Sequence, residues 1–180
     1  MPEYRRAYYK GGTYFFTVVT YKRYPVFGRA EAVDLLNRCI QETQVVYPFT
    51  TEAMVLLPEH LHAIWSLPIN DADFSVRWKR IKTTFTWRYQ GNTAGNITQS
   101  MRKSKERGIW QRRFWEHLIR DQTDFNRHCD YIHYNPVKHG LARSPRDWGH
   151  STFRAFVERG LYPEDWGTAE PEGVVKLGFE

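Results

Sequence analysis

The stretch Pro58-Glu59-His60-Leu61-His62-Ala63-Ile64-Trp65 begins with a tight turn and continues as an apolar run that is typical of a buried β-strand. Side chains of successive strand residues point to opposite faces of a sheet, so His60 and His62 share one face while Leu61 lies on the other. A second strand pattern, residues 50–57, ends directly before the turn. We therefore expect a hairpin on which two neighbouring imidazoles could bind one divalent metal ion.

The segments on either side of this hairpin predict the remaining elements. β-Branched and aromatic residues gather in the expected strands, and apolar residues recur at helical spacing in the expected helices. Strands are expected at residues 13–20, 50–57, 60–67 and 109–119, and helices at about residues 29–46, around the apolar stripe of Phe74, Trp78, Ile81 and Phe85, and from residue 121 or 123 to about residue 134, where Asn135-Pro136 should end the helix. Residues 91–108 are expected to form a loop.

The order β-α-β-β-α-β followed by a helix matches the ferredoxin-like arrangement. This is an α+β fold in which an antiparallel sheet carries two helices on one face. The first and third strands would then be the central pair. His60 and His62 would lie in the middle of the sheet, on the face that the two helices leave open, and the added C-terminal helix could reach that face.

Composition and charge favour one domain with a polyanionic partner. The 180 residues carry a net charge of +6, and the first 163 residues hold 25 bases against 15 acids. This surplus favours nucleic acid as the partner. We expect a single domain at residues 1–163 and an acidic C-terminal tail at residues 164–180. No apolar run approaches the ~20 residues that cross a bilayer, and no signal-peptide core is present, so we expect a cytoplasmic protein without a membrane partner.

The last expected helix brings a tyrosine and an amide together. Residues four apart on a helix lie on nearly the same face, so Tyr131 and Asn135 are expected side by side. Asn135 would present an oxygen beside the tyrosine hydroxyl, and a cap at the helix end is its alternative role. For Tyr131 the alternative role is packing. Tyr134 is the rival functional tyrosine, but it points about 100° round the helix from Asn135.

Together these residues resemble a known family. His60-Leu61-His62 on a strand, followed by Tyr131-x-x-x-Asn135-Pro136-Val137-Lys138-His139-Gly140-Leu141, is similar to the single-tyrosine HUH transposases of bacterial insertion sequences. Two further stretches, Gly11-Gly12-Thr13-Tyr14-Phe15-Phe16-Thr17-Val18 and Trp110-Gln111-Arg112-Arg113-Phe114, narrow the resemblance to the REP-associated tyrosine transposases. The resemblance covers residues 5–148.

This resemblance implies a metal-dependent endonuclease and strand transferase that cuts single-stranded DNA near hairpins such as repetitive extragenic palindromes. His60, His62 and Asn135 would bind Mg²⁺ or Mn²⁺, ions that suit two nitrogens and one oxygen with positions left open. Tyr131 would attack the phosphodiester, giving a 5′-phosphotyrosine intermediate and a free 3′-hydroxyl. No organic cofactor is implied. The repeat-associated branch resembles a monomer, although related transposases can work as dimers.

Basic residues near aromatic side chains are the candidate DNA contacts. Basic groups hold phosphates while exposed aromatic rings stack on unpaired bases. The alternatives are a solvated loop with tryptophans in the core and, for the whole chain, a ferredoxin-like module that binds nucleic acid without chemistry. The expected contacts are Arg112, Arg113 and Lys103, which lie near Trp110 and Trp115, together with Arg77 and Arg80 on the second helix.

Overall fold

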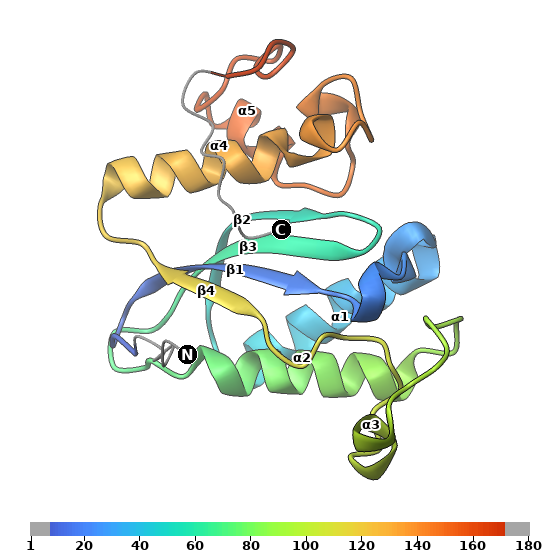
Figure 1. Ribbon diagram of the computed structural model, residues 1–180. Coiled ribbons are helices and arrows are strands. Elements are labelled where there is room, and N and C mark those ends of the chain that lie inside the picture. Colours follow the sequence, from blue (N-terminus) through green and yellow to red (C-terminus); the bar gives the residue numbers. More distant parts are fainter. Residues whose placement is uncertain (1–7, 172–180) are drawn as a thin grey trace, which may run out of the picture.

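The computed structural model of the chain describes residues 8–171. The end of the expected acidic tail, residues 172–180, lies outside these described residues. One antiparallel sheet has the strand order β2-β3-β1-β4, so the first and third strands are the central pair, as expected. Helices α1 and α2 cover one face of the sheet, and α4 crosses the other (Figure 1). The strands are β1 (Thr13–Val19), β2 (Thr50–Leu56), β3 (His60–Ser66) and β4 (Trp115–Leu118), and the α-helices are α1 (Ala30–Val46), α2 (Phe74–Arg88), α3 (Gln99–Lys103), α4 (Gln122–Lys138) and α5 (Phe153–Glu158).

The alternation of side chains along β3 divides the core between the two faces of the sheet. Leu61, Ala63 and Trp65 belong to the apolar cluster under α1 and α2. Trp65 stacks on Trp78 of α2 with ring centres 4.1 Å apart. Ile64 belongs to a second cluster, on the side of α4. The two-residue period of the strand thus sends His60 and His62 to the α4 side.

Strand β4 is shorter than the sequence predicts. It pairs with β1 only over Trp115–Leu118, while Trp110 forms an isolated bridge with Thr20. Between these points the Lys82 ammonium of α2 donates hydrogen bonds to the carbonyl oxygens of Gln111 and Arg112. A side chain satisfies these carbonyls in place of a neighbouring strand, so the expected strand at residues 109–119 is interrupted.

Helix α4 continues through Asn135-Pro136, so the expectation that it ends near residue 134 is wrong. A proline removes one helical N–H donor. The following turn still forms, because the His139 amide donates to the Asn135 carbonyl over 3.0 Å. The chain turns away at Gly140, which has a φ of +68° that glycine adopts without strain. Asn135 therefore lies inside the helix and does not cap it.

Residues 91–108 contain one short helix where a loop was expected. α3 begins after Thr98, whose hydroxyl accepts a hydrogen bond from the Met101 amide over 3.2 Å. The Met101 side chain is buried. This local cap and one apolar anchor explain a helix in an otherwise polar segment.

The segment after α4 covers the free edge of β2. Ser151 forms an antiparallel bridge with Val55, and the Trp148 indole N–H donates to the Leu56 carbonyl over 3.0 Å. The amide of Thr152 donates to the Met54 carbonyl over 2.9 Å. An edge covered in this way is protected from pairing with another chain. No helix within residues 8–171 is long and apolar enough to cross a bilayer.

His133 lies where α4 packs against this segment, and the pH dependence of its contribution to stability provides a test of the packing. Its ring is fully buried, and its Nε2 atom lies 2.9 Å from the Thr152 hydroxyl. Burial lowers the pKa of His133 from 6.5 to about 3. The unfolded chain therefore takes up the proton first. The stabilisation is complete above about pH 6.5 and is lost progressively as the pH falls towards 3.

Between pH 7 and pH 5 we expect the wild-type free energy of unfolding to fall by about 2 kcal/mol more than that of His133→Gln. Urea unfolding at both pH values measures this difference. His150→Gln, which replaces an exposed histidine, should keep the wild-type pH dependence. Equal pH dependence in wild type and His133→Gln would contradict the assignment.

Candidate active site

His60 and His62 form a buried pair in the middle of the sheet. Both are 0% exposed, and their ring centres are 4.9 Å apart. In the pairing of β3 with β1, His62 lies opposite Thr17 and His60 opposite Val19. The neighbouring strand thus supplies the side chains that border the pair.

Oxygen atoms hold the Nδ1 atom of each ring. Glu59 Oε1 lies 3.0 Å from His60 Nδ1, and Thr17 Oγ1 lies 2.9 Å from His62 Nδ1. The hydrogen bond with His60 lowers the pKa of Glu59, so the carboxylate stays ionised and accepts a hydrogen bond from the Nδ1–H group. The lone pair of His60 is then on Nε2, a buried atom with no hydrogen-bond partner among the described residues. This is the usual arrangement of an imidazole that binds a metal.

Tyr131 of α4 lies against this pair. Its ring centre is 5.1 Å from that of His62, and the two rings meet edge to face. Phe15 packs against both rings, with its ring centre 6.0 Å from that of Tyr131 and 5.4 Å from that of His62. The Lys138 ammonium lies 5.0 Å from the centre of the tyrosine ring. Tyr131 is only 1% exposed, so this conformation shields the phenol from solvent.

Asn135 is fully buried one turn after Tyr131. One further turn along, the ring centre of His139 lies 5.3 Å from that of His60. Because residues 131, 135 and 139 follow one another on one side of the helix, Asn135 lies between the contact with His62 and the contact with His60. The four residues expected at the site thus come from β3 and α4, which pack face to face.

The donor types at this place fit a hard or borderline divalent ion. Two imidazole nitrogens and one amide oxygen leave several positions of an octahedral ion open. His60 Nε2 is a buried atom with no hydrogen-bond partner among the described residues. The residues that would hold Mg²⁺ or Mn²⁺ are therefore His60, His62 and Asn135.

Sequence reasoning did not assign four neighbours of this site. Thr17 and Glu59 hold the two imidazoles, while His139 and Lys138 contact His60 and Tyr131. His139 carried a signal, because it follows Asn135 by four residues on the same helix face. The role of Thr17 depends on the register between two strands, which the sequence does not specify.

Known proteins match this chain along nearly its whole length. A REP-associated tyrosine transposase of Escherichia coli (strain K12) is 45% identical over 166 residues, covering 92% of this chain and 91% of the relative. A Haemophilus influenzae protein with the same family designation is 43% identical over 167 residues, covering 93% of this chain and 94% of the relative. The chain belongs to the REP-associated tyrosine transposases.

A solved structure supports this assignment, although no family model matches the chain. It is the structure of a REP-associated tyrosine transposase bound to a REP hairpin, and it is 41% identical to this chain. The match covers 96% of each chain with a TM-score of 0.76. This transposase therefore shares the α+β fold of that structure, with its four-stranded antiparallel sheet and helices.

A second group of side chains in the transposase could hold a metal ion. His117 of β4 lies beside Asp124 and His128 of α4, and their candidate ligand atoms all lie within 4.8 Å of one another. Sequence reasoning left both histidines unassigned. The signal was the spacing of Asp124 and His128, which puts them one helical turn apart.

Arg77 corrects the expected set of DNA contacts. It is 0% exposed, and its guanidinium donates to Asp71 Oδ2 over 2.6 Å and to the Pro48 carbonyl over 2.7 Å. On α2 it lies three residues after Phe74 and four before Ile81, so it belongs to the buried side of the helix. In this conformation Arg77 stabilises the fold and is not presented to DNA.

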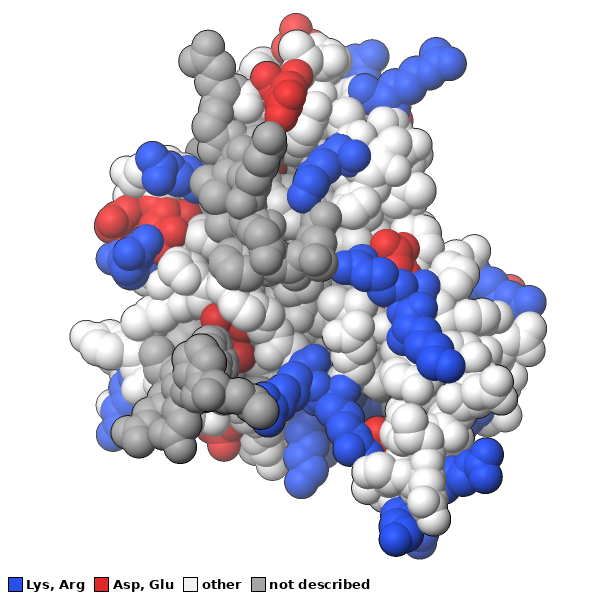
Figure 2. Space-filling model, in the orientation of Figure 1, with Lys and Arg blue, Asp and Glu red and all other residues white. Residues whose placement is uncertain are grey.

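The other expected basic contacts are on the surface. Lys and Arg side chains gather on the lower half of the visible face, over α2 and α3 (Figure 2). Arg112 is paired with Glu106 at 2.9 Å, which ties it to the segment after α3. Trp110, by contrast, is buried against Phe27 and Phe85 and packs in the core, the alternative left open by the sequence. Arg80, Lys103, Arg112 and Arg113 are all exposed.

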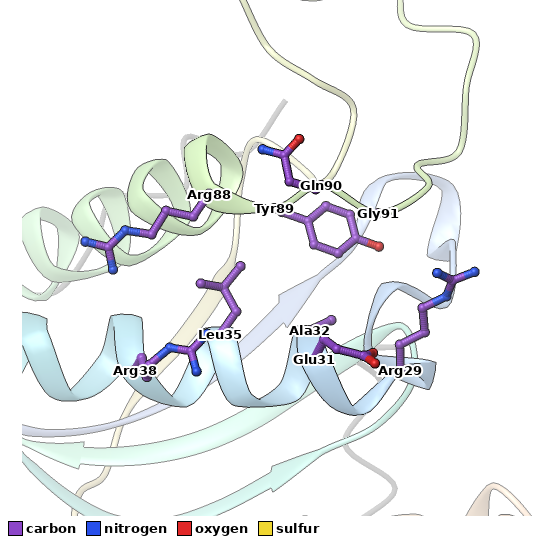
Figure 3. A pocket seen from close by; sticks show the side chains of 9 residues that line it. All are labelled: Arg29, Glu31, Ala32, Leu35, Arg38, Arg88, Tyr89, Gln90 and Gly91. Carbon is purple, nitrogen blue, oxygen red and sulfur yellow. The ribbon is translucent and has the colours of Figure 1, made fainter.

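A pocket between α1 and the end of α2 lies on the opposite side of the sheet from His60 and His62. Figure 3 shows the ring of Tyr89 above it, with Arg88 and Arg38 to one side and Arg29 to the other. Arg88 is paired with Glu42 at 2.7 Å. None of the expected site residues lines this pocket.

Thr17→Val tests whether the hydroxyl beside His62 supports metal binding. Loss of an oxygen that orients a ligand imidazole typically weakens metal binding by ~10–100-fold. Electron paramagnetic resonance of free Mn²⁺ measures how much of the ion is bound. The Mn²⁺ bound at His60 and His62 is the fraction that the double variant His60→Ala/His62→Ala no longer binds, and we expect Thr17→Val to weaken the binding of this fraction by that factor. Thr13→Val is the matched control, because Thr13 lies on the same strand and bonds to Ser66. Equal affinity in the two threonine variants would contradict the role of Thr17.

Proposed function

We propose that this transposase cuts and rejoins single-stranded DNA next to hairpins through a covalent bond to Tyr131. The observation that carries the proposal is the edge-to-face contact of the Tyr131 ring with His62, 5.1 Å between ring centres, beside a second buried imidazole. A nucleophile of the type that forms phosphodiester intermediates thus adjoins two side chains of a type that can bind a metal ion.

The proposed cleavage is a transfer of the phosphoryl group from one oxygen to another. The Tyr131 hydroxyl oxygen gives up its proton and forms a bond to phosphorus, while the bond from phosphorus to the 3′-oxygen breaks. The 3′-oxygen takes up a proton, which leaves a free 3′-hydroxyl and a 5′-phosphotyrosine. Attack by the 3′-hydroxyl of another strand reverses the step, so rejoining needs no ATP.

The side chains around Tyr131 divide this work. Lys138 places a positive charge next to the ring on which negative charge develops. Glu59 and Thr17 orient His60 and His62, which with Asn135 would hold Mg²⁺ or Mn²⁺. When bound there, the ion would supply Lewis-acid polarisation of a phosphate oxygen. No organic cofactor is needed for this chemistry.

The proposed substrate is a DNA hairpin with unpaired flanking bases, such as a repetitive extragenic palindrome. The solved relative is bound to a REP hairpin, and the exposed Arg80, Lys103, Arg112 and Arg113 could contact phosphates here. We propose that the chain acts as a monomer, with Tyr131 serving the histidines of its own sheet. Because the phenol is 1% exposed, binding of the scissile strand must be accompanied by a shift that uncovers it.

Tyr131→Phe removes only the attacking oxygen, so it should abolish covalent capture of DNA while leaving hairpin binding intact. We expect at least a ~10³-fold loss of denaturant-resistant adduct with labelled hairpin DNA and Mg²⁺. Tyr134→Phe is the matched control and should retain adduct formation. An undiminished adduct in Tyr131→Phe, or its loss in Tyr134→Phe alone, would refute the assignment.

The double variant His60→Ala/His62→Ala tests the metal requirement. It should bind the labelled hairpin but fail to cleave it even at high Mn²⁺, because both nitrogen ligands are gone. Full cleavage by this variant would exclude the proposed metal site. Hairpin binding by the wild type without any cleavage product, in Mg²⁺ or Mn²⁺, would favour the alternative of a non-catalytic nucleic-acid-binding module.

A further inference from the structure

Three side chains that the proposed reaction does not use meet near the beginning of α4. His117 comes from β4, whereas Asp124 and His128 lie one turn apart on α4. His117 Nε2 is 2.8 Å from Asp124 Oδ2, and His128 Nδ1 is 3.2 Å from Asp124 Oδ1. The two imidazoles stack on each other with ring centres 4.8 Å apart. Two rigid elements thus hold two nitrogen donors around one carboxylate.

These separations are close to those of ligands around a small metal ion. Ligands that bind a tetrahedral Zn²⁺ at about 2.1 Å lie ~3.4 Å from one another. The separation between His117 Nε2 and Asp124 Oδ2 would need to open by about half an ångström, and the candidate ligand atoms of all three residues lie within 4.8 Å of one another. The donors are therefore gathered before any ion arrives, which reduces the cost of ordering them.

The protonation of the group also suits a cation. Burial opposes ionisation of Asp124, but hydrogen bonds from His117 and from the Arg120 amide outweigh it and leave the pKa of the carboxyl lowered. His128 Nδ1 donates a hydrogen bond to the Asp124 backbone carbonyl over 2.8 Å, so the lone pair of this ring is on Nε2, a buried atom with no hydrogen-bond partner among the described residues. Arg120 competes for Asp124 Oδ2 at 3.4 Å, but its side chain is 73% exposed and can turn into solvent.

We propose that His117, Asp124 and His128 form a second cation site, which takes a borderline divalent transition metal such as Zn²⁺ and fastens α4 to β4. Two imidazoles and one carboxylate are a common zinc ligand set, with water in the remaining position. The His117 side chain is 26% exposed, which gives the ion and that water a route from solvent.

Such an ion would act on the part of α4 that leads to Tyr131. The His128 ring centre is 4.7 Å from that of Phe15, and Phe15 in turn borders Tyr131 at 6.0 Å. An ion that joins β4 to the first turns of α4 would therefore hold the helix in register over β1. This inference does not depend on the proposed DNA chemistry, because the three ligands are separate from His60, His62 and Asn135.

The test uses the full chain carrying His60→Ala/His62→Ala, so that the other histidine pair cannot contribute. Isothermal titration with Zn²⁺ should show one equivalent bound. Zn²⁺ at about 100 times its dissociation constant should raise the Tm by about 5 °C or more. Adding His117→Ala should abolish both effects, and adding His150→Ala, an exposed histidine, should leave both unchanged.

The replacement Asp124→Asn is a second, independent test of the metal site, because it keeps the shape of the side chain and removes its charge. We expect it to weaken Zn²⁺ binding by at least about tenfold. Absence of Zn²⁺ binding in the His60→Ala/His62→Ala chain would overturn the proposal, and the three residues would then be a hydrogen-bonded clasp alone. Zn²⁺ binding that survives His117→Ala would overturn it as well. Neither result bears on DNA cleavage by Tyr131.

Discussion

The position of α4 on the open face of the sheet controls the geometry of the candidate active site. The helix contacts β4 through Asp124 and His128, the centre of the sheet through Tyr131, and the beginning of β3 through His139. Each residue along a helix turns by about 100°. A slip of one residue in this packing would therefore take Tyr131 away from His62. The contacts of His117 with Asp124 and His128 near the beginning of α4 oppose such a slip, as does the contact of His139 with His60 near its end.

The two faces of the sheet bury different kinds of side chain. On the side of α1 and α2 the buried side chains are large and apolar, as the stacked Trp65 and Trp78 show. On the side of α4 the fully buried residues include His60, His62 and Asn135. A buried polar group without its hydrogen bonds costs about 1–3 kcal/mol, so polar groups in such a place weaken a fold unless they are satisfied. The face under α1 and α2 carries the larger apolar cluster, and the face under α4 combines a smaller one with the polar groups that can carry chemistry.

Local periodicity explains which features could be predicted from the sequence. A period of two put His60 and His62 on one face, and a period near 3.6 put Tyr131 beside Asn135. Tertiary contacts explain what could not. Arg77 is buried because its guanidinium donates hydrogen bonds to Asp71 and to the Pro48 carbonyl, two partners that only the folded chain brings beside it. The meeting of His117 with Asp124 and His128 likewise depends on how α4 packs on β4. The prediction that α4 ends at Asn135-Pro136 was wrong, because the loss of one hydrogen bond at the proline did not stop a well-packed helix.

Membership of the REP-associated tyrosine transposases and the solved relative on a REP hairpin make DNA chemistry the natural use of this face. The most direct measurement is mass spectrometry of the protein after reaction with hairpin DNA and Mn²⁺, followed by nuclease and protease digestion. We expect a deoxynucleotide linked through its 5′-phosphate to the peptide at Tyr131. A nucleotide linked to Tyr134 or to any other residue, or a cleaved substrate without a protein-linked nucleotide, would contradict the proposed role of Tyr131.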